Sequence, residues 1–234
     1  MDAVSDRDFI VEYLAAAALF MTHLSRLCEE LILWSNPAFG FVEMDDAWAT
    51  GSSIMPNKKN PDACELLRGK TGRVVGHLTG ALNMLKGLPL AYNKDLQEDK
   101  EALFDAADTV DAALAILPEL LSTLAWKPEA MRAACERGYL QATDVADYLV
   151  GKGLPFREAH HVSGELVRHL AATGARYGDL GLEELRRFSS LFSEDVRPVF
   201  DLAQVIRNKK SPGSTHPDEV AKQLAEARQY LTGA

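Results

Sequence analysis

TGSSIMPNKKNPD, residues 50–62, lies between two long stretches with helical periodicity and has no regular periodicity of its own. It holds three hydroxyl side chains, two adjacent lysines, one glycine, and no acid before its last residue. Its end predicts the start of a helix, because Asn60 can cap, Pro61 suits the first helical position and Asp62 lies in the first turn. This stretch therefore divides the first part of the chain into helices joined by a polar loop.

The positive charge of this loop predicts an anion site beside a serine. A helix start presents free N–H groups and a positive dipole, and Lys58 and Lys59 add charge next to it. Ordinary surface loops have a similar composition, because Gly, Ser, Asn, Pro and Lys turn the chain and stay solvated. On composition alone, a plain surface loop is the better interpretation.

Three long helices are predicted around and after the loop, over residues 6–34, 62–86 and 97–124. Their apolar side chains recur in alternating steps of three and four, as in a coiled coil. In the first helix these positions are Ile10, Tyr13, Ala17, Phe20, Leu24, Leu27, Leu31 and Trp34. Such wide apolar faces predict an all-α fold, an elongated long-helix bundle that is buried in an oligomer.

Two features of these helices call for a structural reason. The second contains Gly69, Gly72, Gly76 and Gly80, each of which costs about 0.5–1 kcal/mol relative to alanine. We expect close helix crossings along them. The third contains Pro118, which predicts a kink.

A domain boundary is expected at the Trp126-Lys-Pro128 segment. We expect residues 1–125 to form a central bundle segment that includes the polar loop at about 49–62, and residues 126–234 to form a small C-terminal helical domain. Shorter helices are predicted in the second part, at about residues 128–137, 143–152, 155–172, 182–188, 195–205 and 217–231.

Composition excludes several classes of protein. With 234 residues, 47% of them apolar, the chain can bury a core as one or two domains. A net charge of −9 argues against nucleic-acid and anionic-membrane partners. No apolar run of membrane-spanning length and no signal peptide is expected. Cys28, Cys64 and Cys135 form neither a CxxC motif nor an even set, so a reducing cytoplasm is predicted.

The histidines invite a metal hypothesis, because His161, Glu165 and His169 fall on one helical face at steps of four. This spacing extends beyond the usual helical pair of ligands. A solvated or partly packed face is the preferred interpretation, and no metal is expected.

Residues 51–61, GSSIMPNKKNP, resemble the mobile-loop motif GSSxMPxKxNP of the fumarase, aspartase and argininosuccinate lyase superfamily. Residues 92–100, YNKDLQEDK, resemble the argininosuccinate lyases in particular, as do residues 2–9 and 137–160. The resemblance implies a bundle of the fumarase/aspartase type and the reversible β-elimination of argininosuccinate to arginine and fumarate, in arginine biosynthesis or the urea cycle. It also implies no cofactor, and a cytoplasmic homotetramer whose active sites are shared between subunits.

The resemblance assigns catalytic roles to three residues of this sequence. Ser52 aligns with the serine that removes a proton from the carbon beside a carboxylate. A hydroxyl is a poor base unless its ionised form is stabilised, and Lys58 with the helix start is the local source of charge. Glu65 aligns with the acid that pairs with the family's catalytic histidine, which this sequence lacks.

Substrate-binding roles follow in the same way. Asn60 aligns with the asparagine that helps to bind the fumarate-end carboxylates. Tyr92, Gln97 and Lys100 match substrate-binding positions, and Lys100 suits a succinyl carboxylate. Thr50 and Arg7 are weaker candidates, expected to support the loop and to form an ion pair near the site.

No stretch matches the N-terminal domain or two further bundle helices of the family. The chain alone is therefore expected to be inactive or nearly so, because losing a positioned acid or base costs on the order of 10² to 10⁴ in rate. Two alternatives stay open: a non-enzymatic structural protein similar to the delta-crystallins, and another lyase of the superfamily such as adenylosuccinate lyase. Residues 92–100 disfavour the second alternative.

Overall fold

The computed structural model describes residues 1–233, and the chain divides into two compact units, Met1–Ala130 and Met131–Ala234. Each unit has a hydrophobic core of its own. Helices make up most of both units, so the predicted all-α class is confirmed. The functional division expected after residue 125 stays a prediction.

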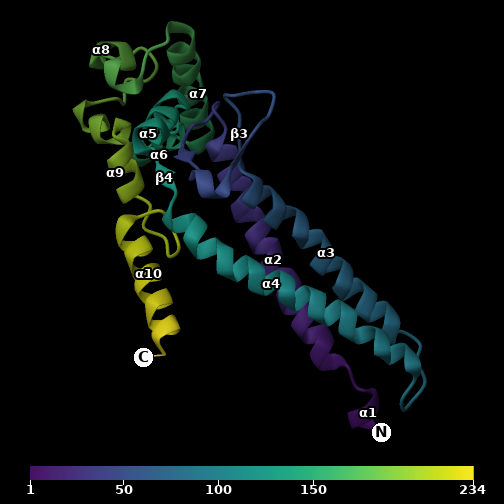
Figure 1. Ribbon diagram of the computed structural model, residues 1–234. Coiled ribbons are helices and arrows are strands. Elements are labelled where there is room, and N and C mark those ends of the chain that lie inside the picture. Colours follow the sequence, from purple (N-terminus) through teal and green to yellow (C-terminus); the bar gives the residue numbers. More distant parts are fainter. Residues whose placement is uncertain (234) are drawn as a thin grey trace. The chain divides into compact units, whose positions relative to one another are not determined.

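Three long helices build the first unit: α2 (Asp8–Ser35), α3 (Asp62–Leu85) and α4 (Asp99–Ser122). They run side by side in Figure 1, and α2 has the more extensive contacts with α3. A short α1 (Asp2–Ser5) precedes them, and the 3₁₀ helix η2 (Lys94–Glu98) leads into α4. The predicted third helix therefore begins as a tighter turn, and α4 then continues through Pro118.

Only half of the apolar positions predicted for α2 are buried. Its buried positions are Ile10, Leu14, Ala17, Ala18, Met21, Leu24, Cys28 and Leu31. The predicted positions Tyr13, Phe20 and Leu27 lie one residue before the buried ones, at the edge of the core, and Tyr13 is exposed. The reason is geometric. Because α2 contacts two helices, its buried face is wider than the coiled-coil face that was predicted, and it includes the positions next to the predicted ones.

The glycines of α3 meet no close helix within the described part of the chain. A Cβ atom added at Gly69, Gly72, Gly76 or Gly80 would find nothing within 4 Å. All four glycines are exposed, in steps of three and four along one side of α3. The expected close crossings are therefore wrong for this chain by itself.

Two short strand pairs, which the periodicity did not predict, tie the segments together at one end of the bundle. β1 (Val42–Glu43) pairs antiparallel with β4 (Ala125–Trp126). β2 (Thr50–Gly51) pairs with β3 (Lys59–Asn60), close to the start of α3. The 3₁₀ helix η1 (Asp46–Trp48) lies between β1 and β2.

The second unit consists of short helices around Phe192, Leu149, Leu166, Leu170 and other buried side chains. Its elements are α5 (Pro128–Arg137, which starts in the first unit), α6 (Ala142–Gly151), α7 (Phe156–Thr173), η3 (Tyr177–Asp179), α8 (Leu182–Leu185), η4 (Glu194–Phe200), α9 (Leu202–Arg207) and α10 (Pro217–Thr232). The single helix predicted over residues 195–205 is wrong. Asp201 interrupts it, because its backbone is extended and its side chain accepts a hydrogen bond from the Ala203 N–H at 3.0 Å, which starts α9.

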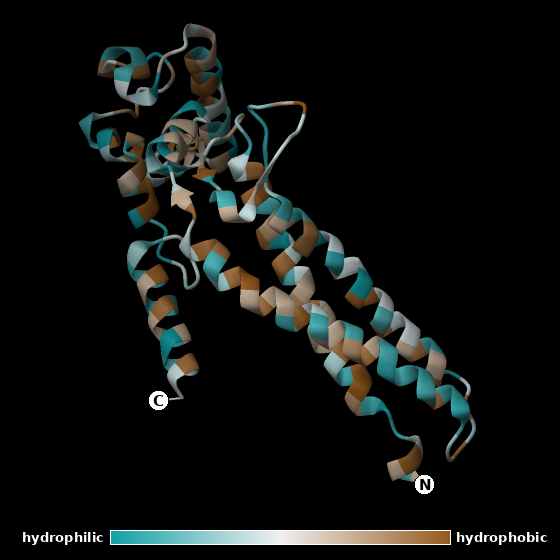
Figure 2. Ribbon diagram, in the orientation of Figure 1, coloured by the Kyte–Doolittle hydropathy of each residue, from teal (hydrophilic) through white to brown (hydrophobic). Residues whose placement is uncertain are grey.

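α2 is long and apolar enough to cross a membrane, by length and composition alone. The expectation that no apolar run reaches this length is thus wrong. Core helices of soluble proteins meet the same two conditions, and one side of α2 is packed in the core of the first unit. Figure 2 shows apolar residues interspersed with polar ones along α2, α3 and α4.

Candidate active site

The polar loop of residues 50–62 is a hairpin whose base is fixed and whose tip is exposed. β2 and β3 close the base, with Thr50 opposite Asn60. The Thr50 hydroxyl donates to the Asp62 carboxylate, and Lys59 Nζ lies 2.6 Å from Asp46 Oδ1. Ile54 at the tip is 86% exposed. A tip held only at its base can move against a ligand without disturbing the bundle.

Ser52 lies at the point where the hairpin turns. Its Oγ accepts hydrogen bonds from the N–H groups of Ile54, at 3.2 Å, and Met55, at 3.1 Å. Two donors on one oxygen favour the ionised form of a hydroxyl. The sequence analysis assigned this stabilisation to Lys58 and the helix start, and missed these backbone donors. The one sign of these donors in the sequence is Ser52 itself, because a serine hydroxyl can accept from the backbone N–H two residues further on and so form a tight turn.

Within residues 1–233, the side chains of the other predicted loop residues make no hydrogen bond to the Ser52 hydroxyl. Lys58 is exposed and makes no ion pair within residues 1–233. Glu65 is exposed in the first turn of α3. Asn60 does not cap α3: it pairs with Thr50, and the helix begins at Asp62 after Pro61. The predicted cap is wrong, because the strand pair holds Asn60 one residue before the N-cap position, which Pro61 occupies.

A second group of predicted residues surrounds a carboxylate that the sequence analysis missed. Asp99 is 4% exposed, and its two oxygens face Arg7 Nε at 2.5 Å and Lys100 Nζ at 2.8 Å. Burial raises the pKa of Asp99, but the hydrogen bonds and charges of Lys100 and Arg7 outweigh burial and hold this pKa below its ordinary value. The ion pair expected for Arg7 is therefore present, and Lys100 keeps more than half of its side chain exposed.

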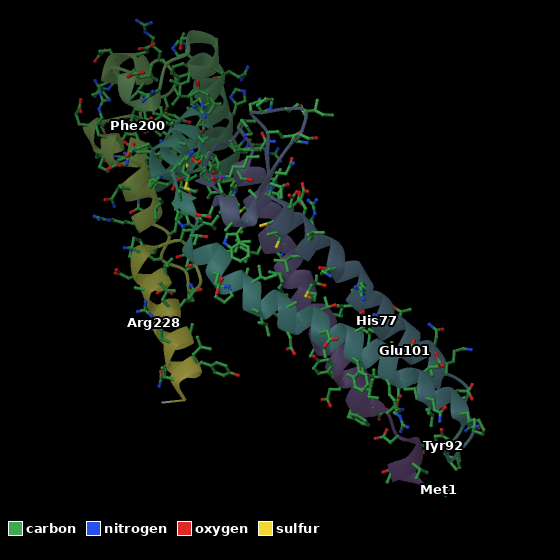
Figure 3. All side chains as sticks on the ribbon, in the orientation of Figure 1. Met1, His77, Tyr92, Glu101, Phe200 and Arg228 are labelled. Atoms are coloured by element: carbon green, nitrogen blue, oxygen red, sulfur yellow. The ribbon has the colours of Figure 1, made fainter. Side chains whose placement is uncertain are left out.

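Tyr92 and Gln97 belong to the same end of the unit as this carboxylate. Tyr92, labelled in Figure 3, is 46% exposed in the connection between α3 and η2. Gln97 is exposed within η2. Tyr92, Gln97 and Lys100 thus each expose a polar group, a phenol, an amide and an ammonium group, of the kind that suits a carboxylate ligand.

The predicted site residues form two groups rather than one. α3 separates them, and its 24 residues correspond to about 36 Å at 1.5 Å per residue. Figure 1 shows the β3 hairpin at one end of α3 and the connection to η2 at the other. The loop group is Thr50, Ser52, Lys58, Asn60 and Glu65, and the connection group is Arg7, Tyr92, Gln97, Asp99 and Lys100. No small ligand can contact both groups of one chain.

The histidines of the second unit contact carboxylates singly. His169 Nε2 lies 2.9 Å from Glu184 Oε1, and His161 Nδ1 lies 3.9 Å from Glu165 Oε2. Within residues 1–233, no three His, Cys, Asp or Glu side chains are grouped as a metal would require. These are surface pairs, each of which contributes about 0–1 kcal/mol.

Two family profiles match the chain. One, described as "Lyase", matches residues 1–76, which include the whole loop group. The other, described as "Argininosuccinate lyase C-terminal", matches residues 139–207 in the second unit.

Curated relatives match over the full length of the chain. The argininosuccinate lyase of Moorella thermoacetica is 57% identical over 100% of this chain and 50% of that protein. The argininosuccinate lyase of Desulfovibrio desulfuricans is 53% identical over the same shares. The chain thus spans about half the length of the curated relatives it matches. Among solved structures, an EDDS lyase variant with bound fumarate is 26% identical, with a TM-score of 0.84, over 99% of this chain and 48% of that one.

Proposed function

This chain belongs to the argininosuccinate lyase family, and we propose that it forms half of an enzyme that cleaves argininosuccinate to arginine and fumarate. The observation that carries the proposal is the hydrogen bonding of Ser52. Its Oγ already accepts two backbone N–H groups, which is the arrangement that a serine base requires.

The chemistry begins with a weakly acidic proton on the carbon beside a carboxylate of the succinyl group. Ser52 Oγ, as the alkoxide, takes this proton, and the negative charge moves onto the carboxylate. The neighbouring carbon–nitrogen bond then breaks, the electron pair leaves with the nitrogen of arginine, and the carbon–carbon double bond of fumarate forms. In the reverse direction, Ser52 returns the proton. The N–H groups of Ile54 and Met55 stabilise the alkoxide without the desolvation cost of a buried cation.

Lys58, Asn60 and Glu65 complete the loop group in this proposal. Lys58 and Asn60 face the charge that develops on the carboxylates when the tip closes, and Lys58 is free of competing ion pairs within residues 1–233. Glu65 pairs with a catalytic histidine that another segment supplies. Thr50 holds the loop base through Asp62.

The connection group binds the rest of the substrate. Lys100 meets a succinyl carboxylate, and Tyr92 and Gln97 supply a hydroxyl and an amide for its polar atoms. Asp99 fixes Lys100 and Arg7, so the ammonium group is ordered before the substrate arrives. Binding in an ordered site loses less conformational entropy than binding to a free side chain.

Both groups can serve one site only if they come from different chains. The separation of about 36 Å along α3 excludes assembly within one copy. We therefore include in the proposal a homotetramer with shared active sites, in which the loop end of one copy meets the connection end of another. The exposed glycine face of α3 and exposed side chains such as Leu66, Val75 and Leu82 give it a helix surface for such contacts. A cytoplasmic location and a role in arginine biosynthesis belong to the same proposal.

Complementation tests this function. The chain is co-refolded with a full-length relative in which the serine equivalent to Ser52 is replaced by alanine, and fumarate and arginine release from argininosuccinate are measured. Activity is expected in the mixture and not in either component. The matched control is the same mixture made with the Ser52→Ala chain, which should stay inactive.

Mixed oligomers without activity would contradict the proposal and favour a structural, delta-crystallin-like role. Sedimentation velocity establishes that the oligomers form. Stabilisation by AMP plus fumarate, instead of arginine plus fumarate, would point to adenylosuccinate as the substrate, because only a true ligand of the folded state raises the melting temperature.

A further inference from the structure

The first unit contains an open cavity of about 280 Å³ between α3, α4 and η1. α3 and α4 lie side by side and run in opposite directions (Figure 1). Most of the lining is apolar and includes Trp48, Ala63, Leu66, Leu67, Ala113 and Ile116. Four polar residues also line the cavity: Thr50, Asp62, Lys70 and Thr109. Of the residues assigned to the proposed active site, Thr50 alone borders it.

The polar residues mark the two ends of this cavity. Asp62 and Lys70 lie about 12 Å apart along the axis of α3, at 1.5 Å per residue. About one turn beyond Lys70, Arg73 Nε donates to Asp105 Oδ2 at 2.6 Å. Asp105 precedes Thr109 by about one turn of α4. Because the two helices are antiparallel, Thr109 therefore lies at the Lys70 end of the cavity, and Asp62 lies at the other end.

Thr109 carries a buried hydroxyl without a partner. It is 5% exposed, and its hydroxyl makes no hydrogen bond within residues 1–233, whereas Thr22 and Thr79 donate to the carbonyl four residues before them. The unpaired side-chain atoms of the described chain that have practically no accessible surface are Gln141 Oε1 and the Tyr177 hydroxyl. The Thr109 oxygen is not among them, so it keeps accessible surface in the cavity that it lines. A ligand that accepts from this hydroxyl removes the cost of leaving it unpaired.

Lys70 is a half-buried cation without an ion pair in the described part of the chain. Its neighbours along α3 are both paired, Arg68 with Glu29 and Arg73 with Asp105. A charge beside an apolar cavity is screened less by water than a fully solvated one, so it attracts an anion more strongly. The ammonium group of Lys70 and the hydroxyl of Thr109 are both donors, and this end of the cavity therefore suits an anionic acceptor.

We propose that this cavity binds a medium-chain carboxylic acid. One carboxylate oxygen accepts from Lys70 Nζ and the other accepts from the Thr109 hydroxyl, as charge-assisted hydrogen bonds. The hydrocarbon chain follows the apolar lining between α3 and α4 toward Trp48. Asp62 at the far end repels a second carboxylate, so the site favours a monocarboxylate over a dicarboxylate.

The test is calorimetric titration of the whole chain with octanoate, without argininosuccinate. We expect saturable binding at one site. Hexanoate, which lacks two methylene groups, should bind about tenfold more weakly, because it buries less apolar surface. Octylammonium has an apolar chain of the same length and the opposite charge. It should also bind at least about tenfold more weakly than octanoate, because Lys70 repels it.

Variants separate binding from folding. Lys70→Met keeps an unbranched apolar side chain and removes the charge, so it should weaken octanoate binding by about tenfold or more. Thr109→Val replaces the hydroxyl with a methyl group, and should weaken binding by about fivefold or more. Without ligand, Thr109→Val should melt no lower than the parent chain, because the hydroxyl has no partner to lose. The matched control is Lys86→Met, an exposed lysine just after α3 and outside the cavity, which should bind octanoate as the parent does.

Equal binding of octanoate and octylammonium would overturn the proposal, because it would show hydrophobic contact without recognition of the carboxylate. Absence of saturable binding at millimolar octanoate would also overturn it, and would favour a contact surface for another helix in this place. Unchanged affinity in Lys70→Met would overturn the carboxylate contact, whether or not Thr109→Val folds. The titration contains no argininosuccinate, so its failure and the failure of the proposed function are distinguishable.

Discussion

Ser52 and Asp99 are the two residues whose hydrogen bonds matter most for the proposed active site. The hairpin gives Ser52 Oγ two backbone donors, so the stabilisation of an alkoxide is part of the loop and moves with it. Asp99 organises the opposite end of the unit, where one buried carboxylate holds both Arg7 and Lys100. In both cases the decisive groups were not among the residues predicted from the sequence: the N–H groups of Ile54 and Met55 for Ser52, and the Asp99 carboxylate for Arg7 and Lys100.

Replacing Ser52 with alanine should remove the base without unfolding the chain. Within residues 1–233 the Ser52 side chain hydrogen-bonds only to N–H groups of its own exposed loop, so stability should change by no more than about 0.5 kcal/mol. In the complementation mixture, kcat should fall by about 10² or more, with KM nearly unchanged. Steady-state kinetics and a thermal melt check both parts. A fall in KM equal to the fall in kcat would assign Ser52 to ground-state strain instead of proton transfer.

Replacing Asp99 with asparagine should destabilise the chain in a pH-dependent way. The folded-state pKa of Asp99 is lowered, so its contribution to stability is present above its unfolded pKa of about 4 and is lost as the pH falls through the folded pKa. At pH 7 the variant should lose about 1–3 kcal/mol, the value of hydrogen bonds to a buried charge. The difference should shrink on acidification.

Urea unfolding at a series of pH values measures this effect. Asp105→Asn is the matched control: Asp105 also accepts from two cationic or titratable side chains, Arg73 and His77, but it is more exposed than Asp99. We expect a smaller loss in the control. A difference between parent and Asp99→Asn that does not depend on pH would show that packing, not charge, explains the Asp99 effect.

At the scale of elements, α3 has two roles: it separates the two groups of site residues, and it presents an exposed side. As a spacer it keeps the loop group and the connection group about 36 Å apart. As a surface it presents Gly69, Gly72, Gly76 and Gly80 along one exposed side. Four glycines destabilise an isolated helix, so their benefit has to come from close approach of another helix, and within residues 1–233 no helix makes it.

Gly76→Ala should therefore act in opposite directions on the chain and on its assembly. The added Cβ meets nothing within 4 Å, so the free energy of unfolding of the isolated chain should rise by about 0.5–1 kcal/mol. Co-assembly with a full-length relative should weaken if this side of α3 packs against another helix. Urea unfolding and sedimentation velocity measure the two effects.

Gly164→Ala is the control for this prediction. Gly164 is an exposed glycine of α7 whose added Cβ also meets nothing within 4 Å. It should give the same stabilisation without any change in assembly. Equal assembly of both variants would mean that the glycine side of α3 faces solvent in the oligomer.

At the scale of the whole molecule, each of the two units has a hydrophobic core of its own. The first unit contains both groups of the proposed active site, and the second unit contains none of their residues. The core of the first unit is formed by three helices, which leaves large apolar side chains such as Phe9, Leu19 and Phe104 exposed. The core of the second unit is closed by many short elements around Phe192.

Residues 131–234 expressed alone should fold cooperatively, because their core is complete within the described residues of that unit. Residues 1–130 alone should self-associate, because exposed apolar faces of this extent are unstable in water. Circular dichroism melts and sedimentation velocity check the two fragments. A second unit that melts without cooperativity would show that its stability depends on the first.

The sequence by itself determined the all-α class and the approximate positions of most helices. The three long helices and most of the shorter helices of the second unit follow from periodicity and from Pro and Gly signals, because these report local backbone preferences. The resemblance of residues 51–61 and 92–100 supplied the family and the candidate residues, since specific side chains at fixed spacing persist within a motif.

Only the tertiary structure decided which of those residues meet. It assigned Ser52 to backbone donors, put Asn60 in a strand pair, revealed Asp99 between Arg7 and Lys100, and separated the candidates into two groups. It also showed that no helix of the described chain covers the glycines of α3. Periodicity cannot give these results, because it records which face of a helix is apolar but not which partner covers that face or how far apart its two ends lie.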